Sequence, residues 1–151
     1  MFKSLYNHYE TTKHKWWVFY YISKFCLKLF KRAILHDFSK YNYKQSKLFS
    51  ENVHKLKKMT YASEEYKETL ERLKPALDHH YKLNPHHPEH YEKGFEDMLG
   101  VDRIEMIIDW LAATKRHEDG DINKSIDANQ LRFRYSYYDK EWLRKIVGDL
   151  K

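Results

Sequence analysis

The stretch VDRIEMIIDWLAATKRH, residues 101–117, decides the fold class of this chain. Its apolar residues recur with the period of an α-helix, so one face of the predicted helix is apolar. The residues of that core face are Ile104, Ile107, Ile108 and Leu111. A stripe beside it carries Glu105, Asp109 and Arg116, and charged groups beside a core are costly unless they pair or bind a metal ion. Two interpretations stay open for this edge: a structural ion pair to Arg116, or a metal ligand at Asp109.

The rest of the chain also predicts helices. The same periodicity indicates four more helical segments, near residues 11–31, 33–41, 63–81 and 139–147, and the second of these could extend toward Val53. Pro75 is expected to kink or split the third of these, and the aromatic segment before the last one is expected to be extended or a loop. The 151 residues include only four glycines and three prolines, which favours helices joined by short turns. We therefore expect an all-α fold of about five to six helices in a single domain, residues 1–151.

Cysteine and hydropathy restrict the class of protein. Cys26 is the only cysteine, so the sequence excludes an internal disulfide and a zinc site built on several thiolates. The most apolar run, WWVFYYISKFCLKLF at residues 16–30, is interrupted by Lys24 and Lys28 and is shorter than the ~20 apolar residues that span a bilayer. The N-terminus lacks a signal-peptide pattern. These features predict a cytoplasmic protein without a membrane partner.

Positive charge is concentrated in the first part of the chain. Residues 1–60 contain 13 Lys and Arg against 3 acidic residues, whereas residues 61–151 contain 15 against 19. A solvated basic face is one interpretation. A surface that attracts a phosphate-bearing partner is the other.

The stretch HHYKLNPHHPEHY, residues 79–91, holds five of the ten histidines. Buried imidazoles need hydrogen-bond partners, so the stretch indicates either a solvated loop or a metal site. His80 continues the inward stripe of the helix before it, whereas His79 is turned about 100° away. Helical phase cannot choose between His86 and His87, which lie in the loop. We favour His87 as a ligand, because Glu89 and His90 then remain for proton transfer.

The string HDFSK, residues 36–40, is the second candidate for chemistry. His36 and Asp37 are adjacent, and on a helix both could reach one ion beside its surface. Lys40 lies three residues after Asp37, on the same face, where it suits the binding of a phosphate oxygen. His14 lies on the apolar stripe of the first predicted helix. It is either a metal ligand or a histidine with a structural role in the core.

The order of these motifs resembles the HD superfamily of metal-dependent phosphohydrolases. That family has a helical core in which a histidine, an HD doublet and a distal aspartate surround a divalent metal ion. The strings HDFSKY, HHYKLNPHHPEHY and IEMIIDWLAATKRH also resemble a family of small phage and bacterial proteins. The resemblance implies a first ion bound by His14, His36, Asp37 and Asp109. It implies a second ion at the histidine cluster, with His80 and His87 as ligands.

The resemblance also implies a reaction. Imidazole and carboxylate ligands suit one or two ions of Mn, Fe, Co, Ni, Zn or Mg. The expected activity is hydrolysis of a phosphate mono- or diester, with a nucleotide as the small-molecule substrate. The residues implied beside the metal are Lys40 and Arg116, which would hold phosphate charge, and Glu89 and His90, which would move protons.

Two other functions compete with hydrolysis. Similar scaffolds with two irons activate oxygen, and the additional histidines permit that chemistry. The basic and aromatic first sixty residues instead suit a non-catalytic protein that binds nucleic acid or a nucleotide.

Overall fold

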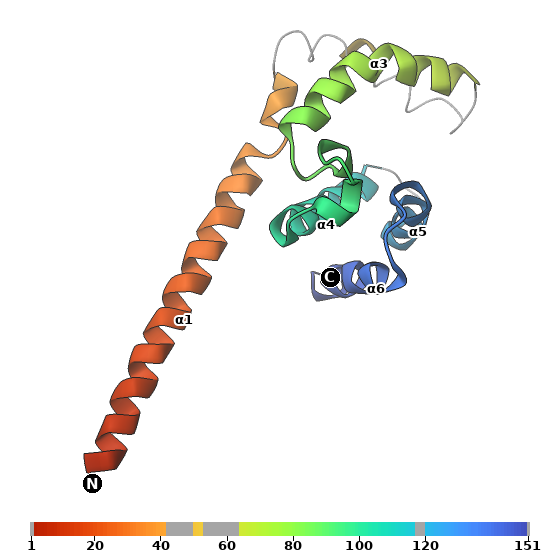
Figure 1. The fold of residues 1–151 in the computed structure, drawn as a ribbon. Helices are drawn as coiled ribbons and strands as arrows, with labels where there is room; N and C mark the ends of the chain where they lie inside the picture. The colour runs from red at the N-terminus through yellow and green to blue at the C-terminus, as the bar shows by residue number, and fades with distance from the viewer. Residues whose placement is uncertain (1, 42–49, 53–63, 117–119, 151) are drawn as a thin grey trace. The chain divides into compact units, whose positions relative to one another are not determined.

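The computed structural model describes residues 2–41, 50–52, 64–116 and 120–150. Every regular element within these ranges is a helix (Figure 1). The predicted all-α fold class is therefore confirmed. The extension of the second predicted helix toward Val53 lies largely outside the described residues.

The chain divides into two compact units, Met1–His36 and Asp37–Lys151. The first unit is a single helix, α1 (Phe2–Leu35), which is longer than the predicted segment at both ends. This unit has seven Lys and Arg and one acidic residue, so the whole net charge of +6 belongs to it. The second unit is neutral overall, and each unit is described by itself below. The single domain predicted over residues 1–151 stays a prediction.

The described part of the second unit consists of α-helices and 3₁₀-helices. It begins with the 3₁₀-helix η1 (Phe38–Tyr41), and the helix α3 (Glu64–Leu83) runs through Pro75 without being split. The 3₁₀-helices η2 (Pro88–His90) and η3 (Gly94–Asp97) follow. Three α-helices complete the unit: α4 (Gly100–Thr114), α5 (Ile122–Phe133) and α6 (Tyr137–Asp149).

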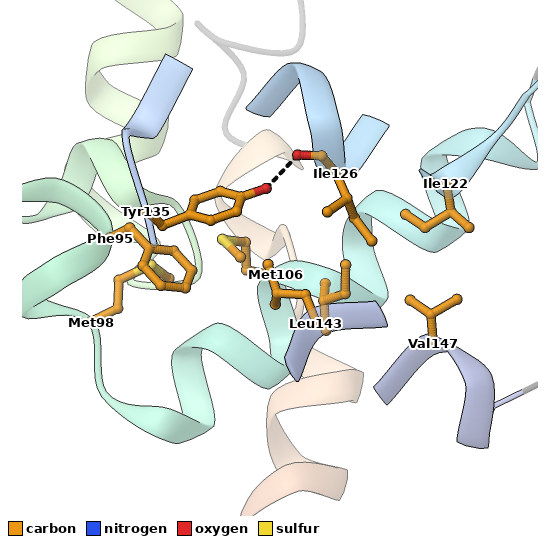
Figure 2. Packing of buried hydrophobic residues seen from close by; sticks show 9 residues of the cluster. Phe95, Met98, Met106, Ile122, Ile126, Tyr135, Leu143 and Val147 are labelled. Atoms are coloured by element: carbon orange, nitrogen blue, oxygen red, sulfur yellow. Dashed lines mark hydrogen bonds between the residues drawn. The ribbon is translucent and has the colours of Figure 1, made fainter. Parts of the chain in front are cut away.

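The hydrophobic core of this unit lies among η3, α4, α5 and α6 (Figure 2). Its centre is fully buried: Met106 and Ile107 come from α4, Ile126 from α5 and Leu143 from α6. Phe95 and Tyr135 pack with ring centroids 4.8 Å apart, and the Tyr135 hydroxyl donates to the Ile126 carbonyl. Of the predicted core face of α4, Ile107 is buried but Ile108 is exposed. The core therefore fixes α4, whose edge carries Glu105 and Asp109.

Helix α5 was not predicted, and local capping explains where it begins and ends. The Asp121 side chain accepts from the backbone N–H groups of Asn123 and Lys124, which fixes the first turn. Arg134 has a left-handed backbone with φ 55°, which ends the helix. A capping box between Ser136 and Asp139 then starts α6, two residues before the predicted start.

In the part of the chain that the structure describes, no helix is both long enough and apolar enough to cross a membrane.

Candidate metal centre

The histidine-rich segment after α3 is an ordered series of tight turns. The backbone N–H of His87 donates to the Asn84 carbonyl at 3.1 Å, and that of His90 donates to the His87 carbonyl at 3.0 Å. The Tyr91 N–H donates to the Pro88 carbonyl, also at 3.1 Å. These internal hydrogen bonds pair several backbone groups of the segment, which lowers the cost of packing it against the protein.

Two contacts bind this segment to α4. The Tyr91 hydroxyl donates to the buried Asp102 carboxylate at 2.6 Å. Arg103 donates to the Phe95 and Glu96 carbonyls at 3.1 and 3.2 Å and lies over the Phe95 ring. These interactions connect the turns to the core helix, and they hold the histidines in one place.

Burial separates the five histidines of residues 79–91 into two groups. His80 and His86 are buried, at 1% and 2% exposure, and His87 is half-buried. His79 and His90 are exposed. The inward direction that helical phase predicted for His80 agrees with this burial, and a wholly solvated loop is excluded. The structure brings both His86 and His87 inward, so it does not choose between them.

Asp37, the first residue of the second unit, faces these imidazoles. It lies in the turn between α1 and η1, so the HD doublet is not on a helix as predicted. Its backbone has φ 56°, a left-handed conformation that Asp and Asn tolerate better than most residues. Asp37 Oδ1 lies 3.2 Å from His80 Nε2 and 3.5 Å from His86 Nε2. The turn thus directs the carboxylate at two buried rings.

Four side chains converge on one point of the second unit. One donor atom from each of Asp37, His80, His86 and His87 lies within 4.8 Å of the others. The Nε2 atoms of His80 and His87 are 2.8 Å apart. Three imidazoles and one carboxylate form a donor set that suits a divalent transition metal such as Zn, Fe, Co or Ni. The donor chemistry and its burial therefore fit the predicted cofactor.

The electrostatics of Asp37 and His87 favour the protonation states that bind metals. Burial alone would raise the pKa of Asp37, but the contacts with His80 and His86, together with the hydrogen bond and the charge of Lys40, lower it well below its usual range. Burial and the neighbouring rings of His86 and His80 lower the pKa of His87 to about 3, against an opposing effect of Asp109 and Asp37. A carboxylate and a neutral imidazole are the ligand forms that metal binding requires.

Residues 3–149 match a family of unknown function, DUF5662, which is nearly the whole chain. The chain belongs to the DUF5662 family. No curated protein and no solved structure matches it. The resemblance to the HD superfamily therefore stays a prediction, which rests on the motifs of the sequence.

Two polar residues of this DUF5662 protein hold His80, and sequence reasoning did not assign a role to either. Ser39 Oγ lies 2.8 Å from His80 Nδ1. The Asn84 amide donates to Ser39 Oγ at 2.8 Å and to the His80 carbonyl at 2.7 Å. Ser39 is the serine of HDFSK and Asn84 opens the NPHH string, so both motifs had already drawn attention.

Helix α4 adds two carboxylates near the cluster. The candidate ligand oxygens of Asp37 and Asp109 lie within 4.8 Å of each other. Glu105 Oε1 lies 3.2 Å from His86 Nδ1. The two acids are four residues apart, so one helical face presents both. His86 is thus an ionic partner of Glu105 that the sequence did not predict, and the structural pair with Arg116 stays a prediction.

The four predicted catalytic residues make different contacts in the structure, and not all of these contacts are at the cluster. Lys40 forms an ion pair with Asp37 Oδ2 and so lies beside the cluster. Glu89 instead binds Arg132 of α5 at 2.6 Å. The exposed His90 reaches the Tyr81 carbonyl at 3.1 Å through Nδ1. Arg116 is exposed beyond the end of α4. Lys40 is thus the predicted phosphate ligand that the described contacts place at the candidate metal centre.

The tyrosine at the border of the cluster was also missed. The Tyr81 ring lies 4.9 Å from that of His87, between centroids. Burial and the charge of Glu89 raise the pKa of the Tyr81 phenol, and Arg132, which hydrogen-bonds to it, acts in the opposite direction. Glu89 and Arg132 therefore form a polar border around Tyr81, and a sequence separation of more than forty residues between them concealed this arrangement.

The two predicted ligands of the first unit, His14 and His36, are separated by its helix. His14 is exposed on α1, which continues without a break to Leu35. At about 1.5 Å per residue, 22 residues of helix put His14 roughly 33 Å from His36. An unbroken α1 is not compatible with binding of one ion by both residues, so this part of the predicted ligand set is corrected. His36 remains next to Asp37 through the peptide bond.

Proposed function

We propose that this protein is a metal-dependent phosphohydrolase whose divalent ion is held by Asp37, His80, His86 and His87. The observation that carries the proposal is the convergence of these four donors within 4.8 Å, two of them on buried rings. Three imidazoles and a carboxylate gathered at one point are a donor set that divalent transition metals take, and this is what supports a bound ion.

A second ion is part of the proposal. Asp37 has two carboxylate oxygens, and Asp109 lies within 4.8 Å of it. His36, which precedes Asp37 in the chain, stays a ligand that the resemblance implies. Two ions held by these donors would suit phosphate ester hydrolysis, since paired metals stabilise both the attacking and leaving oxygens.

The side chains around the donors suit a phosphate ester. A bound divalent ion supplies an activated water near neutral pH and polarises a phosphoryl oxygen. Lys40, paired with Asp37 and partly exposed, is placed to hold a phosphate oxygen as negative charge develops. The half-buried Tyr81 ring beside His87 closes one side of the site with an apolar face. We propose a phosphate mono- or diester of a nucleotide or related small molecule as the substrate.

The proposal is tested with Asp37→Asn. Asparagine tolerates the left-handed backbone at this position, so the substitution removes the charge and leaves the turn intact. The exposed Asp78→Asn on α3 is the matched control. We expect untagged wild-type protein to contain one or two transition-metal ions per chain and to hydrolyse p-nitrophenyl phosphate, its bis-ester or a nucleotide. Asp37→Asn should lose activity by at least about a hundredfold, and Asp78→Asn should retain it.

Three results would oppose the proposal in different ways. Hydrolysis that survives Asp37→Asn would move the reaction away from this cluster. Wild-type protein that binds no metal would leave the histidines a structural network. Iron content with oxygen-dependent turnover would favour the oxygenase chemistry instead.

A further inference from the structure

His86 is held between two carboxylates. Its Nε2 atom lies 3.5 Å from Asp37 Oδ1, and its Nδ1 atom lies 3.2 Å from Glu105 Oε1. The ring is 2% exposed, and the Glu105 side chain is 12% exposed. The two ring nitrogens therefore face acids from different segments, the turn after α1 and the middle of α4.

In a neutral imidazole the two ring nitrogens have different roles in these two contacts. A neutral imidazole has one N–H and one lone pair, and an ionised carboxylate only accepts hydrogen bonds. A hydrogen on Nδ1 would be donated to Glu105, and the lone pair would then be on Nε2. Nε2 is the nitrogen that faces Asp37, which is the centre of the donor set.

We infer that Glu105 is a positioning residue that fixes His86 with its Nε2 lone pair toward the metal. This inference rests on the proposed function, because it needs a metal at the cluster. Carboxylates that accept from the second nitrogen of a histidine ligand fix the ring's orientation and raise its basicity, and their loss weakens metal binding by about 10- to 100-fold. Glu105 is itself held by α4, whose neighbouring residues Met106 and Ile107 are fully buried.

His80, the neighbouring candidate ligand, has a neutral partner in place of a carboxylate. The Nδ1 atom of His80 meets the neutral hydroxyl of Ser39. A neutral hydroxyl orients a ring but adds less basicity than a carboxylate does. We therefore expect His86 to depend more on its partner's charge than His80 does.

The test compares Glu105→Gln and Glu105→Ala with the exposed control Glu71→Ala on α3. Co²⁺ is titrated into metal-free protein, and its affinity is followed by visible absorption and calorimetry. Glu105→Ala should weaken Co²⁺ binding about 10- to 100-fold with the number of ions unchanged. Glu105→Gln, whose amide oxygen still accepts a hydrogen bond, should recover part of that loss. Glu71→Ala should match the wild type.

A second measurement does not need metal. The nitrogen-15 shifts of the His86 ring, assigned with a His86→Gln variant, report which nitrogen carries the hydrogen. In metal-free wild type we expect it on Nδ1, and Glu105→Ala should shift the ring toward the other form.

The outcomes separate the two proposals. Wild type that binds no Co²⁺ contradicts the proposed function, whereas Nδ1 protonation still tests the contact with Glu105. Wild type that binds Co²⁺ with an unchanged affinity in Glu105→Ala overturns the positioning role alone. Loss of one whole equivalent of Co²⁺ also overturns it, because Glu105 would then be a ligand. If Glu105→Gln and Glu105→Ala bound Co²⁺ with equal affinity, the hydrogen bond that residue 105 accepts would have no effect on metal binding.

Discussion

The imidazole rings of His80 and His87 meet through their Nε2 atoms, which lie 2.8 Å apart. A hydrogen bond between two imidazoles needs one N–H and one lone pair, so one of these two nitrogens carries a hydrogen. A metal ion at this point needs both lone pairs. His80 can then place its hydrogen on Nδ1 and donate it to Ser39 Oγ, 2.8 Å away. The contact is thus the form that we expect of the proposed metal site before an ion binds.

The adjacent pair His79 and His80 offers a matched test of that site. His80 is 1% exposed and belongs to the donor set, whereas His79 is exposed on the same turn of α3. We expect His80→Gln to weaken Co²⁺ binding by at least about a hundredfold, since loss of a ligand should exceed loss of its hydrogen-bond partner. His79→Gln should bind like the wild type. Calorimetric titration checks both, and equal effects would oppose the site.

The stability of the metal-free protein should depend on pH through His87. Burial, with the neighbouring rings of His86 and His80, lowers the pKa of His87 to about 3, whereas its ordinary value is 6.5. Between these values the unfolded chain binds more protons than the folded protein. Stability is therefore lost as pH falls through this window, by at most about 1.4 kcal/mol per pH unit for this group.

Urea unfolding in chelator, between about pH 4.5 and 7, measures this dependence. The lower limit lies above the ordinary pKa of aspartate, so Asp37 stays ionised in both states. His87→Gln should be less sensitive to pH than the wild type, and the exposed His79→Gln should retain the wild-type slope. A slope that is unchanged in His87→Gln would show that the ring is charged in the folded protein.

Substitutions of two leucines test the core that holds α4 in place. Leu143 is fully buried among Met106, Ile126 and Val147, whereas Leu131 on α5 is 84% exposed. Leu143→Ala should lower the free energy of unfolding by about 2–5 kcal/mol, because it removes packed methyl groups and leaves a cavity. Leu131→Ala should change it by less than about 0.5 kcal/mol. Similar values for the two variants would mean that this core does not form.

The sequence predicted the fold class and the positions of most helices because apolar periodicity is a local property. Helix α5 was missed because its stabilising features are one cap at Asp121 and a few core contacts of Ile122 and Ile126. The cluster was predicted in part: periodicity gave the direction of His80. The choice between His86 and His87 depends on turns that follow Asn84, which no periodicity describes.

The partners of the cluster needed the tertiary structure. Glu105 contacts His86 across 19 residues, and Ser39 contacts His80 across 41. The HD doublet was predicted to lie on a helix, but the left-handed backbone at Asp37 ends α1 there and turns its carboxylate toward α3 and the histidine turns.

His14 gives the sharpest disagreement between the resemblance and the helix. The resemblance implies that His14 binds the same ion as His36, whereas an unbroken α1 keeps them roughly 33 Å apart. From the helix we expect His14→Ala to leave the stoichiometry and affinity for Co²⁺ unchanged, while His36→Ala weakens binding. His8→Ala, exposed one and a half turns earlier, is the matched control. If His14→Ala alone lost an ion, α1 would have to break between His14 and His36 when metal binds, because no rotation at the end of a rigid helix shortens that distance.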